Sequence, residues 1–162
     1  MVPNDKAFDG KSSFQCNGRN YYRWHNIRAT GDYRLHFRIV QTNSPYKQGI
    51  ALFLSKFKGT LALNGKRLPV LKGKFAHYIF KEDWFPDGEF MLSVHSEEGN
   101  LVIGNASERP EVGSFTCGAF GCAFWIESLN ENTCRFYCND HEYDEDFDDF
   151  VFDMSIECVA DT

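Results

Sequence analysis

The amino-acid sequence predicts an all-β fold, a single β-sandwich that is jelly-roll-like and mostly antiparallel. Several stretches of strand length alternate apolar and polar residues, and turn residues separate them at intervals of about 8–12 residues. No segment longer than two turns shows a 3.6-residue hydrophobic period, so no amphipathic helix is indicated. A length of 162 residues with 43% hydrophobic content fits one domain over residues 1–162. A closed barrel is the alternative architecture.

The first half of the chain contains two stretches with distinct strand patterns. In Tyr33 to Gln41, aromatic and aliphatic residues alternate with Arg34, His36 and Arg38, which is typical of a strand with one buried face. Gly49 to Phe57 is a largely apolar run, which favours a central strand that is covered on both faces.

Two hairpins are predicted. The first joins Thr60–Leu63 to Lys66–Leu71 through Asn64-Gly65, a dipeptide that supplies the positive φ angles of a type I′ turn. The second joins Glu89–His95 to Leu101–Asn105 through a polar connection that contains Gly99. Further strands are expected before Arg28, at Phe75–Phe80, within Gly113–Leu129, at Thr133–Cys138 and at Phe150–Cys158.

The net charge of -6 conceals an uneven distribution. Residues 11–81 contain 14 Lys and Arg and one acid, Asp32, whereas residues 82–162 contain 20 acids and only Arg109 and Arg135 as basic residues. One interpretation is that the two halves neutralise each other on a shared surface. The other is a bipolar surface whose basic face binds an anionic partner, with these residues: Arg19, Arg23, Arg28, Arg34 and Arg38. A pI of about 5.3 argues against nucleic acid as a partner.

Six cysteines leave three chemical states open, of which buried free thiols are favoured over disulfides or a zinc site. They are Cys16, Cys117, Cys122, Cys134, Cys138 and Cys158. Their spacings differ from the C-x2-C knuckle that identifies zinc sites, and the chain is long enough to fold without disulfides.

The sequence excludes a membrane-spanning helix, because no apolar run approaches about 18 residues. Residues 1–10 lack the charged and apolar regions of a signal peptide. The compartment, extracellular or cytoplasmic, and the oligomeric state stay open.

The stretch from Asn139 to Asp149 concentrates seven carboxylates at the approach to the last strand. Hard cations such as Ca²⁺ take six to eight oxygen ligands, so several carboxylates without basic neighbours indicate a candidate calcium site. Asp144, Asp146 and Asp148 recur at every second residue and would share one face of an extended chain, with Asp149 and Asp140 closing from the side. The alternative is a metal-free acidic loop that balances the basic half.

The same stretch resembles a known family motif. The residues Asp144-x-Asp146-Phe147-Asp148-Asp149-Phe150-Val151-Phe152 are similar to the D-x-D-F-N-D-L-V-F segment of calcium-binding β-sandwich domains of bacterial extracellular proteins. The resemblance covers about fifteen residues. It implies calcium ligands at Asp144, Asp146, Asp148 and Asp149, with Asp148 standing where the family favours Asn.

A non-catalytic binding module is the favoured function. The motifs of serine hydrolases, zinc proteases, P-loop proteins and dinucleotide-binding proteins are absent, and the five histidines are scattered. The expected ligand is a glycan or a protein, with aromatic side chains as stacking surfaces: Tyr21, Tyr22, Trp24, Trp84 and Phe85. Trp125 is expected in the core. The alternative is a protein-interaction or regulatory domain that uses the bipolar surface and keeps the acidic loop free of metal.

Overall fold

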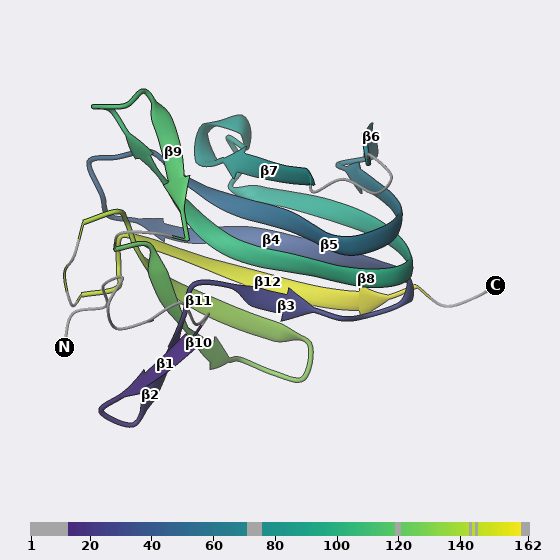
Figure 1. Ribbon diagram of the computed structural model, residues 1–162, viewed down its shortest axis with the longest axis horizontal. Helices are drawn as coiled ribbons and strands as arrows, with labels where there is room; N and C mark the ends of the chain where they lie inside the picture. Colours follow the sequence, from purple (N-terminus) through teal and green to yellow (C-terminus); the bar gives the residue numbers. More distant parts are fainter. Residues whose placement is uncertain (1–12, 71–75, 119–120, 143, 145, 160–162) are drawn as a thin grey trace.

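A computed structural model describes residues 13–70, 76–118, 121–142, 144 and 146–159 (Figure 1). This part of the chain forms twelve β-strands and one short 3-10 turn: β1 Ser13–Cys16, β2 Arg19–Tyr22, β3 His25–Ile27, β4 Gly31–Thr42, β5 Gln48–Leu63, β6 Lys66–Leu68, β7 Ala76–Lys81, η1 Glu82–Trp84, β8 Glu89–Arg109, β9 Ser114–Cys117, β10 Ala123–Ser128, β11 Thr133–Asn139 and β12 Phe150–Cys158. The predicted all-β class is confirmed. Within the same ranges, no helix has the length and apolar character needed to cross a membrane.

All twelve strands belong to one antiparallel sheet. The order along it is β1-β2-β10-β11-β12-β4-β8-β5-β6, while β3 and β9 pair with β8, and β7 pairs with β5. Mostly antiparallel pairing is therefore confirmed, whereas the two-sheet sandwich and the jelly-roll connectivity stay predictions.

The longest strands, β5 and β8, pair with each other along most of their length (Figure 1). The second predicted hairpin is wrong, because Glu89–Arg109 is one continuous strand of 21 residues. Gly99, at a φ of 89°, bends β8 within the strand, and β5 matches the bend with a bulge at Lys56, where φ is 50°. The register shift lets both strands keep pairing beyond the bend, so the polar residues around Gly99 do not reverse the chain.

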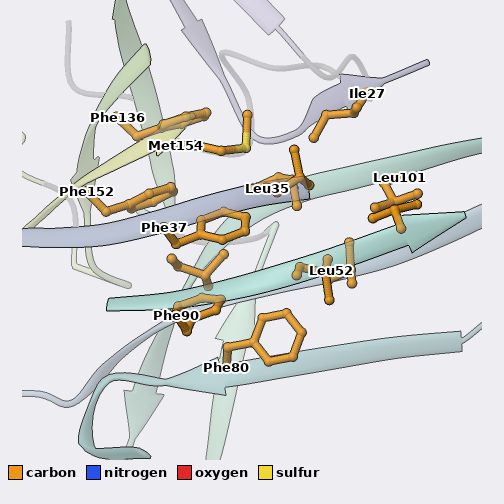
Figure 2. Close-up of a cluster of buried hydrophobic side chains, with 14 of the residues drawn as sticks. Ile27, Leu35, Phe37, Leu52, Phe80, Phe90, Leu101, Phe136, Phe152 and Met154 are labelled. Carbon is orange, nitrogen blue, oxygen red and sulfur yellow. The ribbon is translucent and has the colours of Figure 1, made fainter. Parts of the chain in front are cut away.

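The core collects side chains from the first, middle and last strands of the sequence. Leu35, Phe37, Phe136 and Phe152 are fully buried, and rings stack across neighbouring strands, as for Phe37 and Phe90 at 4.8 Å (Figure 2). A flat sheet would leave this face open to water, and the described residues contain no α-helix to cover it. The sheet must therefore curl over its own apolar face.

The predicted strand within Gly113–Leu129 is interrupted, because β9 pairs with β8 and β10 pairs with β11 and β2.

The indole of Trp24 packs edge to face against Phe53 at 4.6 Å and lies over the backbone of β8 at Gly104. A Cβ at Gly104 would stand 2.6 Å from Trp24 Cζ3, so this glycine is required by close packing.

Opposite charges alternate across the outer face of the sheet. Directly paired positions run from Glu127 on β10 through Arg135, Asp153 and Arg38 to Glu89 on β8. Asp153 accepts two hydrogen bonds from Arg135, at 2.8 and 3.0 Å, and one from Arg38 at 3.1 Å. Burial raises the pKa of Asp153, but the two guanidinium groups outweigh burial and lower it overall. Residues of the basic and acidic halves thus neutralise each other here.

Candidate functional site

The acidic loop connects the end of β11 to the start of β12, beside the loop that follows β4. The pairing of Phe150 with Thr42 brings these two connections together. The Asn43 backbone N–H donates to the Asp149 carbonyl at 2.9 Å, which ties the loops at their base.

Three of the five predicted metal ligands come together. The carboxylate oxygens of Asp144, Asp146 and Asp149 include one from each residue that all lie within 4.8 Å of one another. Asp149 is buried, Asp144 is half-buried and Asp146 is exposed, so the group opens to solvent on one side. A cation could enter from that side and contact all three carboxylates.

Asp140 and Asp148 lie outside this group, and both accept hydrogen bonds from the loop that follows β4. Asp140 accepts hydrogen bonds from the Ser44 hydroxyl at 2.7 Å and from the Glu142 backbone N–H at 2.8 Å. Asp148 Oδ2 accepts from the Asn43 side-chain amide at 2.9 Å. The structure therefore does not group either residue with the other three.

The expected alternation of Asp144, Asp146 and Asp148 fails at Phe147. This residue has a φ of 50°, in the left-handed region, and its ring is buried against Tyr21 with centroids 5.0 Å apart. The Asn139 side-chain oxygen accepts from the Phe147 backbone N–H at 2.9 Å and holds this conformation. Because the chain turns here, Asp149 replaces Asp148 beside Asp144 and Asp146.

The pKa values of two carboxyl groups in the cluster lie far above their ordinary range. Burial raises the pKa of Asp144 to about 7, with further contributions from its hydrogen bond to Asp146 and the charge of Asp149. Burial and the neighbouring carboxylates raise the pKa of Asp149 to about 7, against the lowering effect of the Asp140 backbone N–H, which donates to Asp149 Oδ2 at 2.9 Å. Negative charge thus accumulates here at an energetic cost that a bound cation would relieve.

The donor set suits a hard divalent cation. All three side chains offer oxygen, and no ion pair joins them to a basic residue in the described part of the chain. Among the described residues, the buried Oδ1 atoms of Asp144 and Asp148 have no hydrogen-bond partner. A Ca²⁺ ion could satisfy the Asp144 atom, and the remaining ligands would come from carboxylate and backbone oxygens or water.

A buried polar network supports the loop from the side of β8, and the sequence patterns did not indicate it. Asn105 donates to the Asn139 carbonyl at 2.6 Å, and Asn139 in turn donates to the Asp144 carbonyl at 2.8 Å. His141 lies 3.0 Å from the Ser107 hydroxyl through Nδ1. His141 therefore contributes to this support and is not grouped with the three carboxylates.

The five aromatic candidates do not form one platform. Trp84 is 55% exposed at the end of η1, whereas Phe85 is buried and stacks on Phe90 at 4.2 Å. Tyr21 and Tyr22 lie on β2, near one end of the strand order, whereas η1 follows β7, which pairs with β5 near the other end. Both tyrosines are half-buried against other rings. Trp24 packs on β8 as described above, which leaves Trp84 as the most exposed of the five.

A separate aromatic stack occupies the outer face of β10 and β11. Trp125, expected in the core, is half-buried there, with Tyr137 stacked on it at 4.0 Å and the Arg19 guanidinium 4.0 Å above its ring. Arg19 is thus engaged, Arg23 is buried and Arg38 is paired with Asp153. The five arginines of the bipolar hypothesis do not form one free basic face.

All six cysteines are free thiols in the structure. Cys122 and Cys138 are buried, Cys16, Cys117 and Cys134 are half-buried, and Cys158 is exposed. Burial raises the pKa of the Cys122 and Cys138 thiols well above the ordinary value, which makes both poor nucleophiles at neutral pH.

Comparisons with known proteins found no match to this chain among protein-family models, curated proteins or solved structures.

Proposed function

We propose that this chain is a non-catalytic binding module that is stabilised by calcium in the acidic loop and recognises a glycan or another surface ligand. The observation that carries the calcium part is the convergence of Asp144, Asp146 and Asp149, whose carboxylate oxygens approach within 4.8 Å without a basic partner among the described residues. Bound calcium would hold the β11–β12 connection in place and keep the adjoining loop after β4 ordered.

The calcium proposal is tested by isothermal titration calorimetry on protein stripped with a chelator. Ca²⁺ should bind with one site, and Asp146→Asn or Asp149→Asn should weaken binding by about tenfold or more, because each removes a charged oxygen ligand. Thermal unfolding should show a matching rise in Tm on adding Ca²⁺ to the unmodified protein.

Asp148→Asn is the matched control. It removes the same charge from the same loop, but Asp148 lies outside the cluster and the resembling family has Asn at this position. Calcium affinity should change much less than in the Asp146 and Asp149 variants. Absence of heat and of a Tm rise with Ca²⁺ would contradict the metal proposal, and equal losses in all three variants would contradict the assignment of the ligands.

The ligand contact is proposed at Trp84. Its ring is exposed, and the Lys81 ammonium lies 5.7 Å from it and 5.1 Å from the ring of Phe115 on β9. An indole face beside a cation and a second aromatic ring is the kind of surface on which a sugar ring stacks while its hydroxyl or acidic groups meet the amine.

A glycan array tests this contact. Trp84→Ala should abolish or strongly reduce binding to any glycan that the unmodified protein retains, whereas Leu129→Ala, another exposed apolar residue, should leave binding unchanged. Binding that survives Trp84→Ala, or no binding to any glycan, would refute the sugar contact at this position.

A further inference from the structure

A groove of about 300 Å³ lies on the outer face of the sheet, over β4, β8, β5 and β6. Directly paired positions cross these four strands from Arg34 through Ser93 and Ala62 to Arg67. Because paired residues share a face of the sheet, all four side chains point to the outer side. Two small residues therefore form the floor, and a long cationic side chain stands at each end.

The two arginines are available for a ligand. Both are exposed, and neither forms an ion pair with a carboxylate of the described residues. Asp32 is the one acidic residue among those that line the groove, and its Oδ1 is held 2.6 Å from His95 Nδ1. The groove thus has a net positive lining in a protein whose net charge is -6.

The groove is remote from the acidic loop. Thr42 pairs with Phe150 at the loop, while Arg34 pairs with Glu157 at the other end of the same two strands. Eight residues of extended chain separate Arg34 from Thr42, which corresponds to about 26 Å. This exceeds the Debye length of about 8 Å at physiological ionic strength, so the acidic cluster does not repel an anion in the groove.

The spacing of the arginines selects a ligand with two anionic groups. Three strand spacings, about 14 Å, separate the backbones of Arg34 and Arg67, and both side chains lean over the same floor. Each guanidinium can donate two parallel hydrogen bonds to one carboxylate or phosphate group. Ser93 and Thr60 add hydroxyl groups between them.

We propose that this groove binds a small, elongated ligand that carries two anionic groups, one held by Arg34 and the other by Arg67, with its middle segment over Ser93 and Ala62. Among the residues that line the groove, Tyr33 is the one Phe, Tyr or Trp, and its side chain is buried. Recognition here rests on charge and hydrogen bonds, which distinguishes this groove from the stacking surface at Trp84.

The test is an NMR titration of the full chain with three probes at constant ionic strength: glutarate and pyrophosphate, which carry two anionic groups, and butyrate, which carries one. Glutarate or pyrophosphate should shift the backbone amide signals of Thr60, Ala62 and Ser93, and butyrate should bind more weakly. Arg34→Gln and Arg67→Gln should each weaken binding of the two-anion probe by about tenfold.

Two further variants separate specific binding from general charge attraction. Lys66→Gln removes the same charge from β6, but Lys66 points to the opposite face from Arg67 and should reduce affinity by about twofold or less. Glu157→Gln removes the carboxylate opposite Arg34 and should tighten binding by about twofold. Equal losses in Lys66→Gln and Arg67→Gln, equal affinity for butyrate and glutarate, or no shifts with any probe would overturn the proposal.

Discussion

The aspartates of the acidic loop have two different roles, although their side chains are chemically identical. Asp140 and Asp148 accept hydrogen bonds from the loop after β4, so their charges are used to join two connections. Asp144, Asp146 and Asp149 converge instead, and the left-handed conformation of Phe147 turns the chain between Asp146 and Asp149. The backbone angle at Phe147 thus places Asp149, and not Asp148, beside Asp144 and Asp146.

The raised pKa values of Asp144 and Asp149 predict a pH dependence of the metal-free protein. A carboxyl group with a pKa of about 7 in the folded state, above its unfolded value near 4, binds a proton more tightly when folded. Its contribution to stability is complete below the unfolded pKa and is lost as pH rises through about 7. The free energy of unfolding should therefore be about 1–2 kcal/mol lower at pH 8 than at pH 5.5, after allowance for solvent screening.

Urea unfolding at both pH values, with chelator present, measures this difference. Asp149→Asn, which cannot titrate at this position, should flatten the profile between pH 5.5 and 8. A metal-free protein that is equally stable at both pH values, or more stable at pH 8, would contradict the raised pKa values.

Among the elements, the pair β5 and β8 organises the rest of the fold. Either strand alone meets more than two neighbours along its length, because each bends partway and pairs differently on the two sides of the bend. β8 pairs with β4 before the bend and with β3 and β9 after it. The residues that support the acidic loop, Asn105 and Ser107, lie on the second part.

The contact between Trp24 and β8 gives a test at this level. Gly104→Ala places a methyl group 2.6 Å from Trp24 Cζ3 and 2.9 Å from the Arg23 carbonyl oxygen, so it should destabilise the protein by about 1–3 kcal/mol. Thermal or urea unfolding measures the loss. In a Trp24→Leu background, Gly104→Ala should cost less stability than it does in the unmodified protein, since the smaller side chain relieves the clash. Additive losses would show that Trp24 is not the group that Gly104 accommodates.

Over the whole molecule, charged residues from the basic and acidic halves of the sequence form ion pairs with each other. Arg38 of the first half meets Asp153 of the last strand, Lys47 meets Asp83 at 2.9 Å, and Asp32 lies beside His95. The antiparallel order places β12 directly against β4, which explains why charges far apart in the sequence are adjacent in the fold. Arg34 and Arg67 differ from these residues, because they flank a groove and form no ion pair with a carboxylate in the described part of the chain.

The sequence was sufficient to predict the strands with regular alternation. Tyr33–Gln41 and Phe150–Cys158 were predicted almost at their observed bounds, because one buried face requires a period of two and that pattern is local. The hairpin at Asn64-Gly65 was likewise recognisable, since its positive φ angles require those residue types. The acidic loop could also be identified as a candidate site, because its carboxylates are close together in the sequence.

The remaining features depend on contacts between distant parts of the chain, which periodicity does not encode. Gly99 carries a turn signal, yet pairing with β5 on both sides of it keeps β8 continuous. Phe85 lies in a polar loop and was expected on the surface, yet its side chain is buried and stacks on the ring of Phe90. The choice of Asp149 over Asp148 and the groove between Arg34 and Arg67 likewise arise only once neighbouring strands and loops are in place, because each depends on which residues the curled sheet brings side by side.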